Sequence, residues 1–420
     1  MVATNALIVE DNNMGMELIP FLVKKKINRY PDIKYDDLQL VNYVKSDIEN
    51  IRINLILPTM NKKSIYGGIS TALNFFNSIA DAYNAEKRII VTDADVDAES
   101  EKDYKHWNFI SPDRDMLCNE KITLCEMTIK NRQTKKLAVR KNDFFITTSW
   151  KTKYVFENIT SFQREKYKID RPVLYFIQDY EPGFYAWSTN SCLADSTYKD
   201  GNSIAVFNSE SLKNYFKLLG YKFRAELSFD PILNHNMAQI LQKAETVPRQ
   251  NRILFYGRPF EERNCFALGV EAMKAYIKKY HPDHSWKFIS MGAWHREVKL
   301  ADGFTLCSNG KMSLEAYANY LLESKVGVSL MCSPHPSYPP LEMATFGVKT
   351  VTNAYICKNL KDFNENIVSV ERMDIDSLAD AIHKAVSLSE KGTQLYKGTP
   401  YAVGKDQFED IIKKLLESWR

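Results

Sequence analysis

The sequence has no uninterrupted apolar stretch approaching the roughly 18 residues that a membrane-spanning helix needs. Its first residues, MVATNALIVEDNNMGM, lack a basic start and a long apolar run, so no secretory signal is expected. The seven cysteines are scattered, and no two stand at the two-residue spacing of a zinc or redox motif. Free thiols suit a reducing compartment. These absences predict a cytoplasmic protein whose membrane contact, if any, is peripheral and at the inner face.

The sequence also lacks a large excess of either positive or negative charge. Lysine and arginine number 56 against 52 aspartates and glutamates, and the net charge of +4 gives no general reason to bind nucleic acid. Residues 121–180 are locally basic, with 13 basic and 6 acidic side chains. A solvated surface is the favoured explanation, and a basic face for a membrane or a lipid-linked phosphate is the alternative. Internal repeats and low-complexity segments are absent.

What the sequence does contain is an alternation of short apolar runs and amphipathic segments. Its 420 residues, 45% of them hydrophobic, suffice for two domains. In the first half, helices are expected at TALNFFNSIADAYN (71–84) and ESLKNYFKLLG (210–220). Strands are expected at IRINLILP (51–58), KRIIVTD (87–93), NDFFITTSW (142–150), RPVLYFIQDY (171–180) and NSIAVFNS (202–209).

A second alternating run begins at NRILFYGRP (251–259). Strand, helix and strand in this order form βαβ units with a parallel sheet, so we expect an α/β fold of two Rossmann-like domains. Ligands of such sheets bind beyond the carboxyl ends of the strands, which here would face a cleft between the domains. The expected divisions are a helical extension over 1–50, a first domain over 51–230, a second over 231–400, and a C-terminal helix over 401–420 that crosses back to the first domain.

Two glycine-bearing turns are candidates for binding an anion. Gly67 and Gly68 stand between a strand and a helix, whose free N–H groups and dipole favour negative charge, although a plain tight turn is the simpler explanation. Gly257 and Arg258 end the strand that opens the second domain, and Arg263 follows five residues later. Guanidinium groups bind phosphate in a bidentate manner, but ion pairs with neighbouring glutamates are the alternative.

Lys311 follows Gly310 at a third turn, from which its ammonium could reach the same cleft, although a solvent-exposed lysine is the more frequent case. The stretch SPHPSYPPLE (333–342) has four prolines within seven residues and predicts a rigid, extended loop that leads into a helix beginning near Glu342. A fixed carboxylate suits a polyhydroxylated ligand, and simple compensation of the helix dipole is the alternative. For His335, a hydrogen-bonding role and an ordinary loop position are equally supported.

The segment QDYEPGFYAW (178–187) places two carboxylates and four aromatic rings after a buried strand. Aromatic rings pack on the C–H faces of sugars and carboxylates accept bonds from hydroxyl groups, so this composition favours a carbohydrate site. A loop packed on its own domain is the alternative.

Together, INLILP, GGISTALNFFNSIA, FIQDYEPGFYAWS, VFNSESLKNYF, YGRPFEER and SLMCSPHPSYPPLEMATFGVKTV resemble the family-4 glycosyltransferases of GT-B fold, and particularly the rhamnosyltransferases that build the rhamnan chain of bacterial S-layer glycoproteins. The resemblance covers residues 51–420. It implies an acceptor-binding first domain, a nucleotide-sugar-binding second domain, and retention of anomeric configuration. The donor would be dTDP-β-L-rhamnose, and the acceptor a rhamnose-terminated, lipid-linked glycan.

The resemblance also implies roles for individual residues. Arg258, Lys311, Glu342 and Asp179 would be catalytic, with the two cations stabilising the leaving diphosphate and Glu342 contacting the ribose. The donor would be bound by Gly67, Gly68, Gly257, Arg258, Arg263, Gly310, Lys311, His335, Ser337, Tyr338 and Glu342. The acceptor would be bound by Gln178, Asp179, Glu181, Tyr185 and Trp187.

Three positions depart from the family pattern. Arg263 stands where a lysine is usual, Gln178 where a histidine is frequent, and Pro334 where a first glutamate normally contacts the donor sugar. That contact would then be absent or supplied by His335 or Ser337. No metal or other cofactor is expected, and the Asp93-Ala94-Asp95 triplet is interpreted as an acidic surface turn. The alternatives are a transferase with another nucleotide sugar and a non-catalytic sugar-binding subunit.

Overall fold

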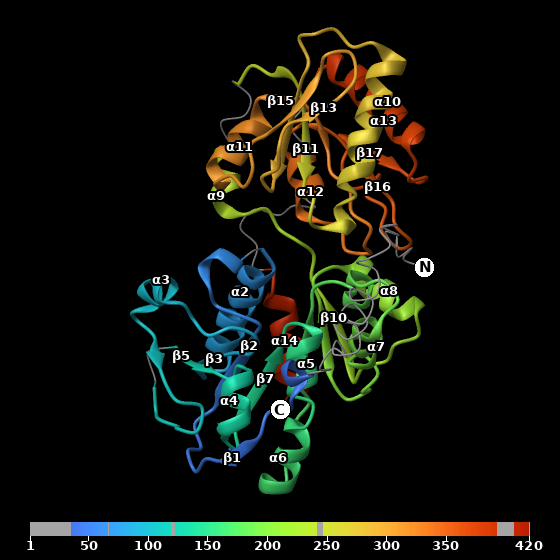
Figure 1. The fold of residues 1–420 in the computed structure, drawn as a ribbon. Coiled ribbons are helices and arrows are strands. Elements are labelled where there is room, and N and C mark those ends of the chain that lie inside the picture. Colours follow the sequence, from blue (N-terminus) through green and yellow to red (C-terminus); the bar gives the residue numbers. More distant parts are fainter. Residues whose placement is uncertain (1–34, 66, 119–121, 242–246, 393–406, 420) are drawn as a thin grey trace, which may run out of the picture.

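A computed structural model describes residues 35–65, 67–118, 122–241, 247–392 and 407–419. They form two α/β domains, drawn one above the other in Figure 1, and each domain is built on one large sheet. The first domain is the lower one in that view and the second is the upper one.

The sheet of the first domain has eight parallel strands in the order β10-β9-β8-β7-β2-β3-β5-β4. All residues of β2, β8 and β9 are buried, because helices cover both faces of a parallel sheet. The strands are β2 (Arg52–Leu57), β3 (Glu86–Val91), β4 (Asn108–Phe109), β5 (Thr123–Glu126), β7 (Asp143–Thr147), β8 (Leu174–Ile177), β9 (Ile204–Phe207) and β10 (Ala225–Ser228). The helices are α2 (Gly67–Ala82), α3 (Ala98–Glu101), α4 (Ile129–Thr134), α5 (Trp150–Val155), α6 (Ile159–Tyr167), α7 (Thr189–Ser196) and α8 (Glu210–Leu218).

The sheet of the second domain has seven strands in the order β13-β14-β12-β11-β15-β16-β17, and the pairing of β13 with β14 is antiparallel. Its strands are β11 (Gln250–Gly257), β12 (Lys287–Gly292), β13 (Val298–Lys299), β14 (Thr305–Ser308), β15 (Ser324–Val328), β16 (Lys349–Asn353) and β17 (Ile367–Val370). Its helices are α9 (His235–Leu241), α10 (Phe266–Tyr280), α11 (Leu314–Leu322), α12 (Tyr338–Thr345) and α13 (Ile375–Glu390).

Both sheets contain the doubly wound strand order of a Rossmann fold. Six adjacent strands of each sheet, numbered by their order along the chain, lie in the order 3-2-1-4-5-6. They are β5-β3-β2-β7-β8-β9 in the first domain and β14-β12-β11-β15-β16-β17 in the second. The strand order reverses between β2 and β7 and between β11 and β15. The loops that leave the carboxyl ends of these four strands therefore diverge, and such switch points are where open α/β sheets bind ligands.

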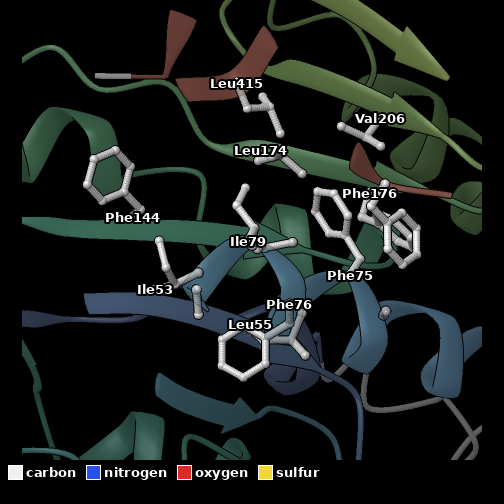
Figure 2. Close-up of a cluster of buried hydrophobic side chains, with 14 of the residues drawn as sticks. Ile53, Leu55, Phe75, Phe76, Ile79, Phe144, Leu174, Phe176, Val206 and Leu415 are labelled. Carbon is white, nitrogen blue, oxygen red and sulfur yellow. The ribbon is translucent and has the colours of Figure 1, made fainter. Parts of the chain in front are cut away.

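The chain crosses between the domains after β10. Phe229 packs in the core of the first domain, whereas Leu233 and two residues of α9 pack with the core of the second. The helix α14 (Glu409–Ser418) then lies in the first domain beside α2 (Figure 1). Figure 2 shows Leu415 of α14 among Phe75, Ile79 and the strand residues of that core.

Residues 35–50 contain a short 3-10 helix, η1 (Asp36–Leu38), and a strand, β1 (Tyr43–Lys45), which pairs with β6 (Leu137–Val139). The described part of the expected helical extension therefore contains no α-helix; apart from η1 and the strand paired with β6, its backbone is irregular. Residues 1–34 of that extension lie outside the described residues. Among the described residues, no helix is long and apolar enough to cross a membrane.

Candidate functional site

The N-terminus of α2 brings two of the expected donor residues beside an expected acceptor residue. A Cβ atom on Gly68 would lie 2.8 Å from Gln178 Oε1, so glycine lets the helix start approach the end of β8 closely. Thr71, one turn into α2, lies 3.5 Å from the Tyr338 hydroxyl of the second domain. Gly67, Gly68, Gln178 and Tyr338 therefore lie together where the two domains meet.

The last residue of β11 has room only for a glycine. A Cβ atom on Gly257 would lie 2.2 Å from Ser290 Oγ and 2.9 Å from the Phe266 ring. Arg258 follows, half-buried, and its Nη2 lies 3.0 Å from Glu261 Oε1. The ion pair that the sequence left open as an alternative is thus present for Arg258.

Arg263 reaches instead toward the first domain. Its Nη1 lies 3.4 Å from Asp179 Oδ2, and its guanidinium stacks 4.1 Å from the centroid of the Phe184 ring. Phe184 belongs to the 3-10 helix η4 (Glu181–Phe184), which follows β8. The expected diphosphate-binding arginine is therefore held by the segment expected to bind the acceptor.

Gly310 and Lys311 lie on a neighbouring loop. Gly310 has a φ of +62°, which glycine adopts without strain, and its carbonyl accepts a bond from the Gly292 N–H at 3.0 Å. The Ala293 N–H in turn donates to the Gly257 carbonyl at 3.0 Å. The loops after β11, β12 and β14 are thereby joined, and Lys311 is exposed on the last of them.

The proline-rich segment forms a hydrogen-bonded turn around His335. The Ser333 hydroxyl donates to Asp179 and accepts from the His335 N–H at 3.0 Å, and His335 Nδ1 accepts from the Ser337 N–H at 3.0 Å. Ser337 has a φ of +68°, a conformation that the bond to His335 helps to hold. Ser211 of α8 donates to the Pro334 carbonyl at 2.9 Å, which is a further bond between the domains.

His335 is a neutral hydrogen-bond donor in this arrangement. Burial lowers its pKa to about 4, so the imidazole carries no charge near pH 7. Because Nδ1 accepts a bond, the ring proton belongs on Nε2. Nε2 is buried and has no protein partner among the described residues.

The helix α12 begins at Tyr338, earlier than the sequence predicts. Pro339 and Pro340 lie in its first turn, where the missing N–H groups have no intrahelical acceptor, so they do not extend the preceding loop. Glu342 lies one turn inside the helix rather than at its start. Burial raises the pKa of Glu342 to about 7, and a hydrogen bond with Tyr317 opposes that rise.

Two of the expected acceptor residues contact the start of α5. A Glu181 carboxylate oxygen accepts the Trp150 backbone N–H, and the Tyr185 hydroxyl lies 2.9 Å from the Trp150 indole nitrogen. Burial raises the pKa of Glu181 to about 8. Trp187, in contrast, is fully exposed.

Two buried polar residues near this junction were not predicted. Asn208 follows β9, is 3% exposed, and its Oδ1 has no hydrogen-bond partner among the described residues. Lys358 is 1% exposed, donates to the Met331 carbonyl at 2.7 Å, and has a pKa lowered to about 8 by burial. Asn208 lies within VFNSE, directly after a buried strand, and that position was the signal available in the sequence.

The acidic triplet is engaged in local contacts. Asp93 accepts a bond from the Thr92 hydroxyl at 2.7 Å, and Asp95 accepts one from Thr128 at 2.9 Å. Within the described ranges, no group of three or more histidine, cysteine, aspartate or glutamate side chains is arranged to hold a metal ion.

Comparisons with known proteins agree with this architecture. The family described as "WsaF, N-terminal domain" matches residues 52–210, and "WsaF, C-terminal domain" matches 251–383. These matches together span more than half of the chain. A curated relative, "O-antigen biosynthesis protein RfbC" of Myxococcus xanthus, is 31% identical over 251 residues, which are 58% of this chain and 19% of that protein. The match thus spans about a fifth of the length of that relative.

Solved structures share the fold at low sequence identity. HepE of Anabaena, solved with UDP and glucose, has a TM-score of 0.58 at 12% identity, covering 88% of this chain and all of that one. Sucrose-phosphate synthase of Thermosynechococcus elongatus has a TM-score of 0.56 at 13% identity, covering 87% and 98%. A trehalose-phosphate synthase of Burkholderia vietnamiensis has 0.53 at 8%, covering 81% and 92%. The expected GT-B fold of two Rossmann-like domains is confirmed.

Proposed function

This chain belongs to the WsaF family through both of its domains, and from that premise we propose that it is a glycosyltransferase of glycan biosynthesis. The proposed reaction transfers L-rhamnose from dTDP-β-L-rhamnose, with retention, to a rhamnose-terminated acceptor. The O-antigen relative and the GT-B fold support the transferase class. The finer donor and acceptor follow from the resemblance of FIQDYEPGFY and SPHPSYPPLEMA to rhamnosyltransferases.

One observation carries the proposal: within the described ranges, buried polar atoms without protein partners come from both sides of the domain junction. Gln178 Oε1 and Asn208 Oδ1 of the first domain are hydrogen-bond acceptors, and Arg263 Nε and His335 Nε2 of the second are donors. A buried polar atom without a partner is costly, by about 1–3 kcal/mol, unless a ligand or water satisfies it. A sugar diphosphate carries hydroxyl groups that donate and phosphate oxygens that accept, so it matches both kinds.

The proposed mechanism stabilises a leaving diphosphate with protein cations. When the sugar–phosphate bond breaks, negative charge develops on the leaving nucleoside diphosphate. Three cations on the loops after β11 and β14 would stabilise it: Arg258, Arg263 and Lys311. Asp179 would receive the proton of the acceptor hydroxyl once a phosphate displaces it from Arg263. Glu342 would contact the ribose, and its raised pKa leaves it able to donate as well as accept near neutral pH.

The deciding experiment combines dTDP-β-L-rhamnose with a panel of rhamnose-terminated acceptors and determines the product linkage by NMR. We expect the transferred rhamnose to have the same anomeric configuration in the product as in the donor. The rate should be unaffected by EDTA. Arg258→Ala and Lys311→Ala should lose most transfer, whereas the surface control Lys413→Ala should not. Full activity of Arg258→Ala would contradict the diphosphate assignment.

The second candidate is a transferase of this fold with another donor. HepE was solved with UDP-glucose, which makes a UDP-hexose the specific alternative. Ranking dTDP, UDP and GDP by the rise in melting temperature they cause separates the donors. Binding of sugars without transfer or donor hydrolysis would favour a non-catalytic subunit.

A further inference from the structure

Cys265 and Cys332 meet at the switch point of the second domain. Cys265 ends the loop that leaves β11, Cys332 lies on the loop that leaves β15, and their sulfur atoms are 3.2 Å apart. Both thiols are free, and Cys332 is exposed to solvent while Cys265 is partly so. A sulfur–sulfur bond is about 2.05 Å long, so joining them requires an approach of about 1 Å.

Hydrogen bonds already connect the two loops that carry these cysteines. The Cys332 backbone N–H donates to the Arg263 carbonyl at 2.7 Å, and the Asn264 side-chain amide donates to the Leu330 carbonyl at 3.3 Å. These bonds hold the two loops in register on either side of the sulfur atoms. A disulfide therefore needs a small movement of side chains rather than a refolding of either loop.

Cys332 has the character of a reactive thiol. The hydrogen bond from the Cys265 thiol and the nearby ammonium of Lys358 together lower the pKa of Cys332 to about 7, against the opposing effect of burial. Lys358 is fixed beside it by its bond to the Met331 carbonyl. Thiolate, rather than thiol, is the nucleophile in cysteine oxidation, and a partly exposed thiolate with a second sulfur beside it is the arrangement that forms disulfides.

We propose that Cys265 and Cys332 are an oxidation site, at which a peroxide converts the two thiols into a disulfide that weakens diphosphate binding. The Cys332 thiolate attacks the peroxide oxygen and, with one proton taken up, gives a sulfenic acid and water. The sulfur of Cys265 then attacks that sulfenic sulfur, and its proton leaves with the hydroxyl group as a second water. Two thiols and one peroxide thus become one disulfide and two waters.

The effect on binding follows from the position of Arg263. This residue lies two residues before Cys265, and its carbonyl already bonds the Cys332 N–H. A covalent link between these loops restricts the Arg263 backbone and keeps its guanidinium against Asp179 and Phe184. This part rests on the proposed function, because it requires Arg263 to leave Asp179 for a phosphate.

The chemical step is tested by treating the reduced protein with hydrogen peroxide and mapping its peptides without reduction. We expect a cross-linked peptide pair containing Cys265 and Cys332, which dithiothreitol separates. The control variants Cys192→Ser and Cys307→Ser, at exposed cysteines elsewhere, should still form it. Cys265→Ser, or Cys265→Ala should the serine variant fold poorly, should not. Failure to form the pair, or equal peroxide-dependent loss of thiols in Cys265→Ser, would overturn the oxidation site.

The binding step is tested by titrating dTDP, UDP and GDP into both forms of the protein by calorimetry. The oxidised form should bind the preferred nucleotide about tenfold more weakly, as expected for loss of one charge-assisted bond, and dithiothreitol should restore the affinity. Cys265→Ser should keep the affinity of the reduced form after peroxide. A mapped disulfide with unchanged affinity overturns the regulatory effect. If none of the three nucleotides binds the reduced protein, the proposed function and this effect fail together, and peptide mapping alone decides the oxidation site.

Discussion

Arg263 shows how one side chain can serve two domains. Its guanidinium lies between the Asp179 carboxylate and the Phe184 ring, both from the first domain. A carboxylate and a phosphate oxygen compete for the same donors, so under the proposed function Asp179 holds the guanidinium that the diphosphate would bind. The junction is thereby closed by a contact that the proposed substrate would exchange for its own.

Asp179→Asn tests this competition. The amide oxygen can still accept the Ser333 hydroxyl, but the negative charge beside the Arg263 guanidinium is removed. We expect the affinity for dTDP to rise by roughly threefold to tenfold, because displacing a carboxylate costs about 1 kcal/mol at a partly exposed site. Transfer should fall, because the proposed proton acceptor is lost. Calorimetry and a turnover assay measure the two effects, with Asp170→Asn as a surface control. A weaker dTDP affinity would contradict the competition.

Glu342 predicts a dependence of stability on pH. Its pKa is about 7 in the folded protein against an ordinary value of 4.5, so the folded chain binds more protons between these values. Stability is therefore full below about pH 4.5 and falls as the pH rises through about 7. Glu342→Gln removes this loss, and we expect it to be more stable than the parent at pH 8 by roughly 2 kcal/mol, discounted for partial exposure.

Urea unfolding of both proteins at pH 5 and pH 8 measures the difference, which should be smaller at pH 5. The same variant should lose most transfer, since the proposed ribose contact is changed. A variant that is less stable than the parent at pH 8 would contradict the burial of this carboxyl. Residues that serve a function often lower the stability of the fold, and a buried carboxyl at the proposed donor site would be an example.

At the residue scale, candidate site residues could be chosen from the sequence, but the residues to which they hydrogen-bond could not. Gly68 lies beside Gln178, and Tyr338 lies near Thr71 of the same helix, while the binding roles expected for these residues stay predictions. The bond between Asp179 and Ser333 joins residues 154 apart, and no local pattern encodes such a pairing. For the same reason Glu181, expected to face an acceptor, instead accepts a backbone N–H of α5.

At the scale of elements, the end of β11 can pack against its neighbours only because residue 257 is a glycine. A Cβ atom there would overlap Ser290 Oγ and crowd the Phe266 ring. Gly257→Ala should lower the free energy of unfolding by roughly 1–3 kcal/mol, as overpacking does, and weaken dTDP binding by displacing Arg258. Gly67→Ala is the matched control for stability, because no heavy atom of the described residues, apart from its chain neighbours and its own helix backbone, lies within 4 Å of its Cβ position. Chemical denaturation distinguishes the two, and equal losses would refute the close approach.

Central elements could be predicted and marginal ones could not. β2, β8 and β9 are continuous apolar runs because both faces of each strand are covered. β10 is partly exposed along its length and β4 has two residues, so neither has a hydrophobic pattern strong enough to detect. The short helix α5 depends on the capping box of Ser149 and Thr152. The sequence did not reveal it, because the strand expected over 142–150 runs through Ser149.

At the scale of the whole molecule, the last helix completes the first domain. Trp419 is fully buried, packs against Tyr83 and Phe144, and donates its indole N–H to the Pro172 carbonyl at 2.9 Å. Trp419→Ala should lower the unfolding free energy of the first domain by about 3–5 kcal/mol, through lost burial and the cavity left behind. Lys413→Ala, on the exposed face of α14, is the control.

Calorimetric unfolding measures this effect. Under the proposed function dTDP binds the second domain, so the transition whose midpoint it raises belongs to that domain. We expect the Trp419 variant to shift the other transition. An equal shift of both would mean that the helix stabilises the junction rather than one domain.

The position of α14 also governs the order in which the protein can be completed during synthesis. Domains generally fold as units as they leave the ribosome, the N-terminal one first. Here the core of the first domain includes Phe408, Ile411, Leu415 and Trp419, which emerge after the entire second domain has been made. The domain that is synthesised first is therefore finished last, and until then the apolar face of α2 that these residues cover is open to chaperones.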